Sequence, residues 1–429
     1  MDIFILLGTM IVCFLIGMPI AYSLAMAAIA GALSVGIPLE ALMLKISDGV
    51  SKVAMLTIPF FVLAGAIMAE GGMARRLVAF ADVLVGLTRL RGGLSIVNVL
   101  ATTFLSGISG SAVADTSAIG SVMIPQMEKN GYPRVFATNL TISSSVQALL
   151  VPPSHNAVLY SLATGGTISI SALFMAGVFP GLLIGFSLIM LCLVIAYREG
   201  HPQGRVVPAK DAVKITIDAA WGLITLVIIL GGILGGIFTA IEAGAVACIW
   251  AFFVTMFVYR DYKWRDLPVL LHRTLRTVAM VMTLIACASA VGYIMALTQM
   301  PAKMTAFFLS ISSNKYVILL LLNVLLLLLG TLLDMAPSIL IATPILLPVM
   351  QNFGVDPVHF GMIMLLNLGI GLCHPPVGAI LFVGCAVGKV SLEEVMRKIW
   401  PFYGVMLFVL MLVTYLPEIS LWLPRHILH

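Results

Sequence analysis

The chain has 429 residues, of which 61% are hydrophobic and 10% are charged, and its formal net charge is +5. A water-soluble fold of this length could not bury so much apolar surface, so the composition predicts an all-α, polytopic membrane protein surrounded by membrane lipids. Membrane orientation explains the positive charge, which gives no reason to expect a nucleic-acid partner. Six isolated cysteines indicate neither a disulfide framework nor a metal cluster.

Long apolar runs follow one another along the chain. The first, residues 3–33, has no basic leader and is too long for the core of a signal peptide, so we expect a retained first helix. The other runs that could cross a bilayer are 53–68, 135–163, 172–197, 215–238, 240–259, 277–298, 360–387 and 402–416. Shorter amphipathic stretches, which predict interfacial helices or, alternatively, loop helices, are 39–52, 75–90, 263–276, 301–312 and 391–398.

Two further apolar stretches are divided. Residues 94–127 are interrupted at 106–115, and residues 316–350 are interrupted at 330–337. Each half is short for a full crossing of the bilayer, so both stretches predict re-entrant helical hairpins. Two ordinary spans joined by a tight turn are the alternative.

The divided stretches belong to one repeated pattern. Matching residues recur at an offset of 223: Gly107 and Gly330, Pro125 and Pro348, Gly131 and Gly354, and the pairs Pro152-Pro153 and Pro375-Pro376. Interrupted hydrophobic segments in corresponding halves are typical of transporters that bind their cargo at the breaks. Each proline pair also removes N–H donors and leaves carbonyl oxygens for an ion, with a simple packing kink as the alternative.

Basic residues predict the orientation. They form four clusters, which are Arg75, Arg76, Arg89, Arg91, Lys129 and Arg134; Arg198, Arg205, Lys210 and Lys214; Arg260, Lys263, Arg265, Arg273 and Arg276; and Lys389, Arg397 and Lys398. The positive-inside rule places all four in the cytoplasm. Only Lys303 and Lys315 flank the second hairpin, so we expect it to open to the other side and the repeats to be inverted. Counting the spans places the N-terminus inside and the C-terminus outside. Lys45 and Lys52 then lie outside, where the positive-inside rule does not predict basic residues.

Five runs occur in order along the chain: SGISGSAVADTSAIGSVMIPQM, LLVPPS, GGIFTAIEAGAVA, LLDMAPSILIATPILLPVM and GLCHPPVG. With these runs the whole chain resembles the large membrane subunit of the tripartite ATP-independent periplasmic (TRAP) transporters. The resemblance implies a sodium-driven importer of organic acids in the bacterial cytoplasmic (inner) membrane, with Na⁺ as coupling ion and no organic cofactor. It also implies two partners, a small membrane subunit and a soluble periplasmic substrate-binding protein.

The resemblance further implies an elevator-type fold of the ion-transporter superfamily, in which a transport domain carrying both hairpins moves against a scaffold. The implied organisation is scaffold helices and an interfacial arm in residues 1–93, the first hairpin and broken helix in 94–166, scaffold helices and arms in 167–315, the second hairpin and broken helix in 316–388, and a C-terminal arm and scaffold helix in 389–429.

The chain departs from the family pattern at two places. The usual Thr-Pro-Thr-Glu reads Thr-Ala-Ile-Glu here, from Thr239 to Glu242, and this spacing also fits a helix capping box. The commoner Thr-Pro-Pro reads His-Pro-Pro from His374, and the change touches an expected ion site.

Small residues at the first tip let the backbone approach a ligand and offer hard oxygen donors. Together with carboxylates at membrane depth, they give a predicted substrate site of Ser109, Gly110, Ser111, Asp115, His155, Asn156, Asp334 and Ser338. The alternatives are helix packing for the serines and glycines, helix capping for the two aspartates, and a satisfied polar pair for His155 and Asn156.

By resemblance, two sodium sites are expected where the tips meet the proline breaks. The first would use Ser106, Ser109, Ala148, Val151 and Pro153, and the second Gly330, Asp334, Gly371, His374 and Pro376. The three residues of each break correspond at the offset of 223.

Other classes of protein fit the sequence less well. There is no HExxH pair for an intramembrane enzyme and no GxxxxGK[ST] loop for an ATP-driven pump, so we expect no enzyme activity. A channel would need no inverted pair of hairpins, but the sequence alone leaves this class open. The main alternative is a self-sufficient sodium- or proton-coupled dicarboxylate-type symporter without a binding protein. C4-dicarboxylates, sialic acid and sugar acids are all compatible substrates.

Overall fold

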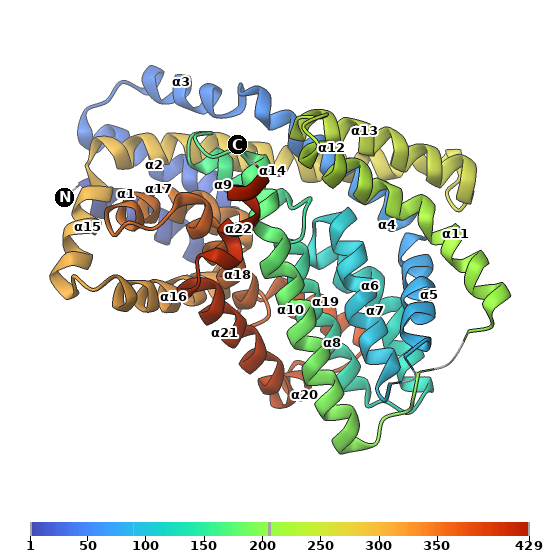
Figure 1. Cartoon of the computed structure of the whole chain (residues 1–429). Helices are drawn as coiled ribbons and strands as arrows, with labels where there is room; N and C mark the ends of the chain where they lie inside the picture. The colour runs from blue at the N-terminus through green and yellow to red at the C-terminus, as the bar shows by residue number, and fades with distance from the viewer. Residues whose placement is uncertain (1, 89, 205–206, 428–429) are drawn as a thin grey trace.

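The computed structural model describes residues 2–88, 90–204 and 207–427, and shows a long layer of helices above a helical bundle (Figure 1). Within these residues every regular element is helical. Seven helices are long and apolar enough to cross a membrane, or eight if Leu392–Lys398 and Trp400–Tyr415 form one bent span. The predicted all-α, polytopic membrane fold is confirmed. Arg89 and Arg205, which belong to the basic clusters, lie outside the described residues.

The elements of the upper layer are α1 (Asp2–Leu15), α2 (Ile20–Val35), α3 (Leu39–Val50), η1 (Val53–Leu56), α4 (Thr57–Glu70), α11 (Ala209–Leu226), η3 (Val227–Gly231), α12 (Gly232–Leu234), α13 (Ala240–Phe253), η4 (Val254–Tyr259), η5 (Trp264–Asp266) and α14 (Leu267–Leu297). The long helix α14 packs against α2, α3 and α4, and α4 packs against α13. This layer is therefore held together by helices from both halves of the chain.

The elements of the bundle are α5 (Met73–Gly86), α6 (Gly93–Ser109), α7 (Ala112–Lys129), α8 (Arg134–Ser145), η2 (Val146–Leu149), α9 (His155–Ala163), α10 (Ile170–Glu199), α15 (Met300–Ile311), α16 (Lys315–Leu332), α17 (Met335–Asn352), α18 (Pro357–Gly371), α19 (Ala379–Gly388), α20 (Leu392–Lys398), α21 (Trp400–Tyr415) and α22 (Glu418–Ile427). α10 packs against α6, α18, α21 and α22, while α7 packs against α8 and α19. Fully buried rings such as Phe174, Phe360 and Phe402 fill the interior.

The bundle contains the repeated unit. α6 and α7 form the first hairpin, and α16 and α17 form the second. Shifted by 223 residues, the bounds of α17 coincide with those of α7, and those of α16 lie within one residue of those of α6. α8, η2 and α9 are the first broken helix, α18 and α19 are the second, and both Pro-Pro bonds at the breaks are cis.

The two hairpins enter the bundle from opposite ends. α10 has 30 residues and so spans about 45 Å, which marks both ends of the bundle. The start of α6 lies at the C-terminal end of α10, where Gly92 N–H donates to Pro202 O. The second hairpin leads into α18 at the other end, where Tyr160 Oη of α9 donates to Pro357 O. The repeats are therefore inverted.

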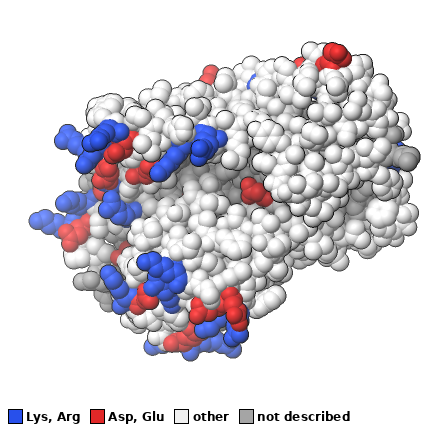
Figure 2. Space-filling model, turned by 180° about the vertical axis from the view of Figure 1, so that it is seen from behind, with Lys and Arg blue, Asp and Glu red and all other residues white. Residues whose placement is uncertain are grey.

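Charge marks one end of the molecule. Figure 2 shows Lys and Arg side chains gathered at one end of the face in view, while the rest of that face is largely uncharged and is hollowed near its middle. Arg198 lies in the last turn of α10. The positive-inside rule assigns it to the cytoplasm, and the start of α10 to the outside.

Two elements differ from the sequence prediction. The apolar run 3–33 is two helices, because Gly17 adopts a left-handed conformation (φ +82°) and Pro19 cannot donate a helical hydrogen bond. α1 and α2 pack side by side, so the chain reverses there and the count that predicted an inside N-terminus does not hold. The stretch 263–276 and the run 277–298 are largely one helix, α14, because no glycine or proline separates them after Pro268.

Candidate functional site

The first hairpin turns at Gly110. Its φ of +59° is a left-handed conformation that glycine adopts without steric cost, and its N–H donates to Ser106 O at the end of α6. Ser111 then caps α7, since its Oγ accepts a hydrogen bond from Ala114 N–H at 3.4 Å. The predicted tip residues Ser109, Gly110 and Ser111 thus form the turn itself.

Asp115 lies one helical turn beyond the tip and is fully buried. Ser106 Oγ donates to its Oδ2 at 2.6 Å, and Ser109 Oγ donates to its Oδ1. Asp115 therefore ties the two halves of the hairpin together, and Ser111 caps the helix instead. Ser109 Oγ also accepts a hydrogen bond from Ser111 N–H at 3.2 Å. A hydroxyl oxygen has two lone pairs, so Ser106 and Ser109 each keep acceptor capacity for a donor or a cation.

The first tip contacts the first proline break. A Cβ added at Gly110 would clash with Pro153 O, so the two backbones touch. Ala148, Val151 and Pro153 are all buried, and the carbonyl oxygens of Val151 and Pro153 accept no hydrogen bond from the described chain. The tip and the break therefore present hard oxygen donors, of the kind that suits Na⁺, close to one another.

The second tip differs from the first. Asp334 occupies the N-cap position of α17, but its side chain caps no N–H group and is exposed. The alternative that Asp334 caps this helix is therefore not supported. Ser338 is buried, and its Oγ donates to Asp334 O at 2.9 Å, within the same helical turn.

The second break also touches its hairpin through backbone. A Cβ added at Gly371 would lie 2.7 Å from Gly330 Cα, so α16 and α18 meet there without side chains between them. The carbonyl oxygens of His374 and Pro376 accept no hydrogen bond from the described chain. The ring of His374 folds onto its own loop, with Nδ1 2.7 Å from Pro375 O.

A cavity of about 220 Å³ opens at the first tip. It brings Ser109, Ser111 and His155 of the bundle together with α4 and α14 of the upper layer, and its lining residues are Ile58, Val62, Gly65, Ala66, Ala69, Ser109, Ser111, Ala114, His155, Leu159, Thr277 and Val281. Asn156, Asp334 and Ser338 do not line it. Of the predicted substrate residues, Ser109, Ser111 and His155 line this cavity, whereas Gly110, Asp115 and Asn156 lie beside it and Asp334 and Ser338 lie at the second tip.

The sequence analysis missed the upper-layer side of this cavity. Val62, Gly65, Ala66 and Ala69 share one face of α4 at spacings of three and four residues, and a Cβ at Gly65 would lie 2.9 Å from Ser109 O. In the sequence, the regular spacing of small residues on α4 was the signal that could have indicated a close contact at this face.

Two polar residues outside the cavity have structural roles. Glu242 forms a complete capping box with Thr239, whose N–H donates to Glu242 Oε2 at 2.8 Å. The structural reading of Glu242 is confirmed. Tyr403, which no sequence pattern singled out, donates its hydroxyl to Cys373 O beside the second break.

The chain matches known proteins over nearly its whole length. The family model described as the tripartite ATP-independent periplasmic transporter, DctM component, matches residues 7–419. The chain is 36% identical over 438 residues to the C4-dicarboxylate TRAP transporter large permease protein DctM of Rhodobacter capsulatus, covering 99% of both chains. It is 37% identical over 412 residues to the sialic acid TRAP transporter large permease protein SiaM of Vibrio cholerae, covering 95% of both.

The fold is also similar to that of a solved transporter structure. The YdaH transporter of Alcanivorax borkumensis, described as having an unusual topology, superimposes with a TM-score of 0.66 over 90% of both chains at 15% sequence identity. At this identity the likeness concerns the fold alone.

Proposed function

This chain belongs to the DctM family of tripartite ATP-independent periplasmic transporters as a large permease subunit, and we propose that it imports a small organic acid with sodium as the coupling ion. One observation carries the proposal. In each repeat the backbone of the hairpin directly contacts the proline-broken helix of the same repeat. The contact is between Gly110 and Pro153 in the first repeat and between Gly330 and Gly371 in the second. Two equivalent groups of unpaired oxygens result, near the places where the helices are interrupted.

Both groups of residues fit sodium. At the first, Ser106 and Ser109 donate their hydroxyl protons to Asp115 and keep lone pairs that a cation could use. A cation bound there would stabilise the ionised form of the buried Asp115 carboxyl. At the second, the free carbonyl oxygens of His374 and Pro376 offer equivalent ligands. Bound sodium would supply the positive charge that links the ion gradient to substrate binding.

An organic acid suits the cavity at the first tip. The relatives are named for a C4-dicarboxylate and for sialic acid, both of which are carboxylates. The N-termini of α7 and α9 both lie at the cavity, through Ser111 and His155. Two helix N-termini directed at one space favour a negative charge there.

The two bodies fit an elevator mechanism. Both hairpins and both broken helices lie in the bundle, and α14 spans the upper layer. Where the bodies meet at the first tip, the upper layer presents the small side chains of Gly65, Ala66 and Ala69, which offer little resistance to sliding. The bundle would carry the substrate across the membrane as the moving part.

Partners follow from the family, whose transporters are tripartite. Among the described residues the connections at the outer end of the bundle are short, such as the one between α9 and α10, and none of them forms a domain that captures dilute substrate. Capture would fall to a soluble periplasmic binding protein. A small membrane subunit would cover the apolar outer face of the upper layer, where Phe4, Ile11 and Leu15 are exposed.

The test is uptake by proteoliposomes that contain this chain, its small subunit and the loaded binding protein. A sodium gradient directed inward should drive accumulation of the organic acid that the binding protein carries. Replacing sodium by choline at fixed pH should abolish accumulation. Undiminished uptake in choline would disprove sodium coupling.

The same preparation separates the proposal from a self-sufficient symporter. The chain alone should not accumulate substrate, and adding the small subunit and the loaded binding protein should restore uptake. Sodium-driven accumulation by the purified chain alone would favour the autonomous carrier.

A further inference from the structure

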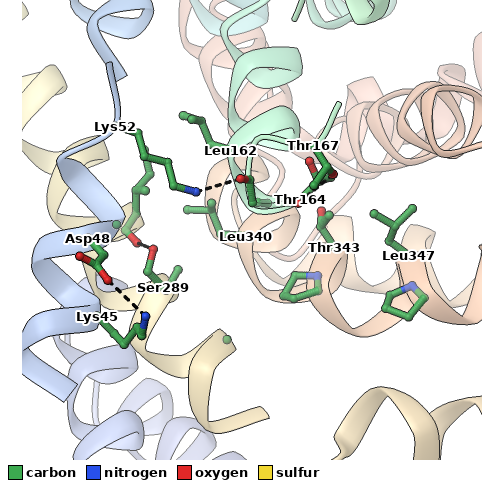
Figure 3. Close-up of a pocket in the computed structure, with 18 of the residues that line it drawn as sticks. Lys45, Asp48, Lys52, Leu162, Thr164, Thr167, Ser289, Leu340, Thr343 and Leu347 are labelled. Atoms are coloured by element: carbon green, nitrogen blue, oxygen red, sulfur yellow. Dashed lines mark hydrogen bonds and ion pairs between the residues drawn. The ribbon is translucent and has the colours of Figure 1, made fainter. Parts of the chain in front are cut away.

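A second cavity, of about 720 Å³, lies between the upper layer and the bundle. Figure 3 shows Lys45, Asp48 and Lys52 reaching it from α3 and the segment after α3, with Thr164 and Thr167 on the other side. Thr164 and Thr167 belong to the connection that precedes α10. The cavity therefore lies at the outer end of the molecule, opposite the basic clusters.

The charges of this cavity are unexpected for an outer surface. The positive-inside rule does not account for Lys45 and Lys52. Lys45 Nζ lies 3.2 Å from Asp48 Oδ2, whereas Lys52 Nζ donates to Gly165 O at 3.0 Å and has no carboxylate partner among the described residues. Two ammonium groups and one carboxylate leave the lining with a net positive charge.

The bond made by Lys52 joins the two bodies. Lys52 belongs to the upper layer, where α3 is held firmly on α14 because a Cβ at Gly49 would clash with Ser289 Oγ. Gly165 belongs to the bundle. A neutral carbonyl carries only a partial charge, so it attracts an ammonium group less strongly than the full negative charge of a carboxylate does. Lys52 is therefore placed to exchange Gly165 for an anion.

The remaining polar groups suit an organic anion that also carries hydroxyls. Thr164, Thr167 and Ser289 donate their hydroxyl protons to nearby backbone carbonyls, so their lone pairs stay available as acceptors. Leu340 and Leu347 of α17 provide an apolar wall. Donors for a carboxylate and acceptors for hydroxyls thus line one space.

We propose that this cavity is an outer vestibule that holds a carboxylate-bearing organic anion before it reaches the hairpin tips, with Lys52 as its principal anchor and Lys45 as a second cation. The inference rests on the proposed transport function and adds a site to its path. The bond from Lys52 to Gly165 bridges the two sides of the vestibule, and the carboxylate takes the place of Gly165 O.

The test uses spheroplasts that express the complete transporter with Thr167→Cys and Cys248→Ala, since the other five native cysteines are buried. Impermeant anionic and cationic methanethiosulfonates are compared as labels at Thr167→Cys. The positive potential of the two lysines should make the anionic label react faster than the cationic label. Adding Lys45→Gln and Lys52→Gln should lower the ratio of the anionic to the cationic labelling rate about tenfold. The carboxylate that the transporter imports, or succinate, gluconate and N-acetylneuraminate in turn, should slow labelling in a saturable manner, and Lys52→Gln should remove this protection.

Lys315→Gln is the matched control. Lys315 also lies at the outer end and donates to a glycine carbonyl, Gly354 O, at 3.0 Å, but it does not line the cavity. It should change neither the rate ratio nor the protection. An unchanged ratio in the double variant, absence of protection by every carboxylate, or equal protection by inorganic phosphate would overturn the proposal. Uptake measured in parallel distinguishes the two proposals. Normal uptake with no protection from labelling would disprove the vestibule alone, whereas protection from labelling without uptake would disprove the proposed transport function.

Discussion

Asp115 and Asp334 both lie just beyond the turn of a re-entrant hairpin, but their surroundings differ. Asp115 is buried and accepts hydrogen bonds from two serines, whereas Asp334 is exposed and caps nothing. At the offset of 223 residues, Ser111 corresponds to Asp334 and Asp115 corresponds to Ser338. The two repeats therefore exchange serine and aspartate at two equivalent positions.

The reason lies in the partner helix of each hairpin. The residues equivalent to Ser106 and Ser109 are Leu329 and Leu332. A buried carboxylate at position 338 would have leucines, not serines, at these two equivalent positions, and a buried carboxylate without hydrogen bonds is strongly unfavourable. Only the first hairpin has hydroxyl groups at these two positions. An equivalent position in a repeat therefore does not carry an equivalent role.

The largest expected effect is at the first tip. Gly110→Ala forces a left-handed conformation on alanine and drives its Cβ into Pro153 O, so uptake should be lost while the protein still inserts in the membrane. Gly131→Ala is the matched control, because Gly131 also has a positive φ but has open space around it. Uptake should be measured at matched expression. Equal uptake by the two variants would show that contact with the break is unimportant.

The next effect separates the two carboxylates. Asp115→Asn weakens two charge-assisted hydrogen bonds, worth about 1.5–3 kcal/mol each, so the melting temperature in detergent should fall clearly. Asp334→Asn should leave it unchanged, because the exposed carboxylate has no partner in the described chain.

The sodium requirement of uptake also distinguishes Asp334 from Asp115. If Asp334 contributes to the second sodium site, Asp334→Asn should raise the sodium concentration for half-maximal uptake about tenfold, which equals about 1.4 kcal/mol. Equal melting temperatures for the two asparagine variants, or an unaltered sodium requirement in Asp334→Asn, would contradict these assignments.

A smaller effect is expected at the second break. Gly371→Ala places a Cβ 2.7 Å from Gly330 Cα, and relief requires α16 and α18 to separate slightly. Uptake should fall partially, with a higher sodium requirement. Gly404→Ala in α21, where nothing lies within 4 Å of the added Cβ, should behave as the unmodified chain. Complete loss of uptake in Gly371→Ala would contradict the expected order, because the second break would then be as important for transport as the first.

The smallest effect concerns the helix caps. Ser111→Ala removes the cap of α7 and should cost about 1 kcal/mol of stability. Asp334→Ala removes a side chain that caps nothing, so thermal unfolding should not change. If Asp334→Ala destabilises the protein as much as Ser111→Ala, then the second tip does depend on its N-cap side chain.

Much of the fold was predictable because glycine and proline act locally. The interruptions at 106–115 and 330–337 placed both tips correctly, and the proline pairs placed both helix breaks. The division between α1 and α2 was missed, although Gly17 and Pro19 were visible, because the apolar run concealed them. Residues of α4 that face the first tip were missed because a face of small residues alone does not identify its partner.

The sequence by itself determined the membrane class and the inverted repeat, since these follow from hydropathy, spaced helix breakers and charge bias along one dimension. It also indicated the family, through the resemblance carried by the five sequence runs. The tertiary structure decided which carboxylate is buried, which backbone segments touch at Gly110 and Gly371, and how Lys52 comes to lie beside Gly165. These depend on contacts between residues far apart in the chain, and side-chain burial and hydrogen bonding are properties of such contacts.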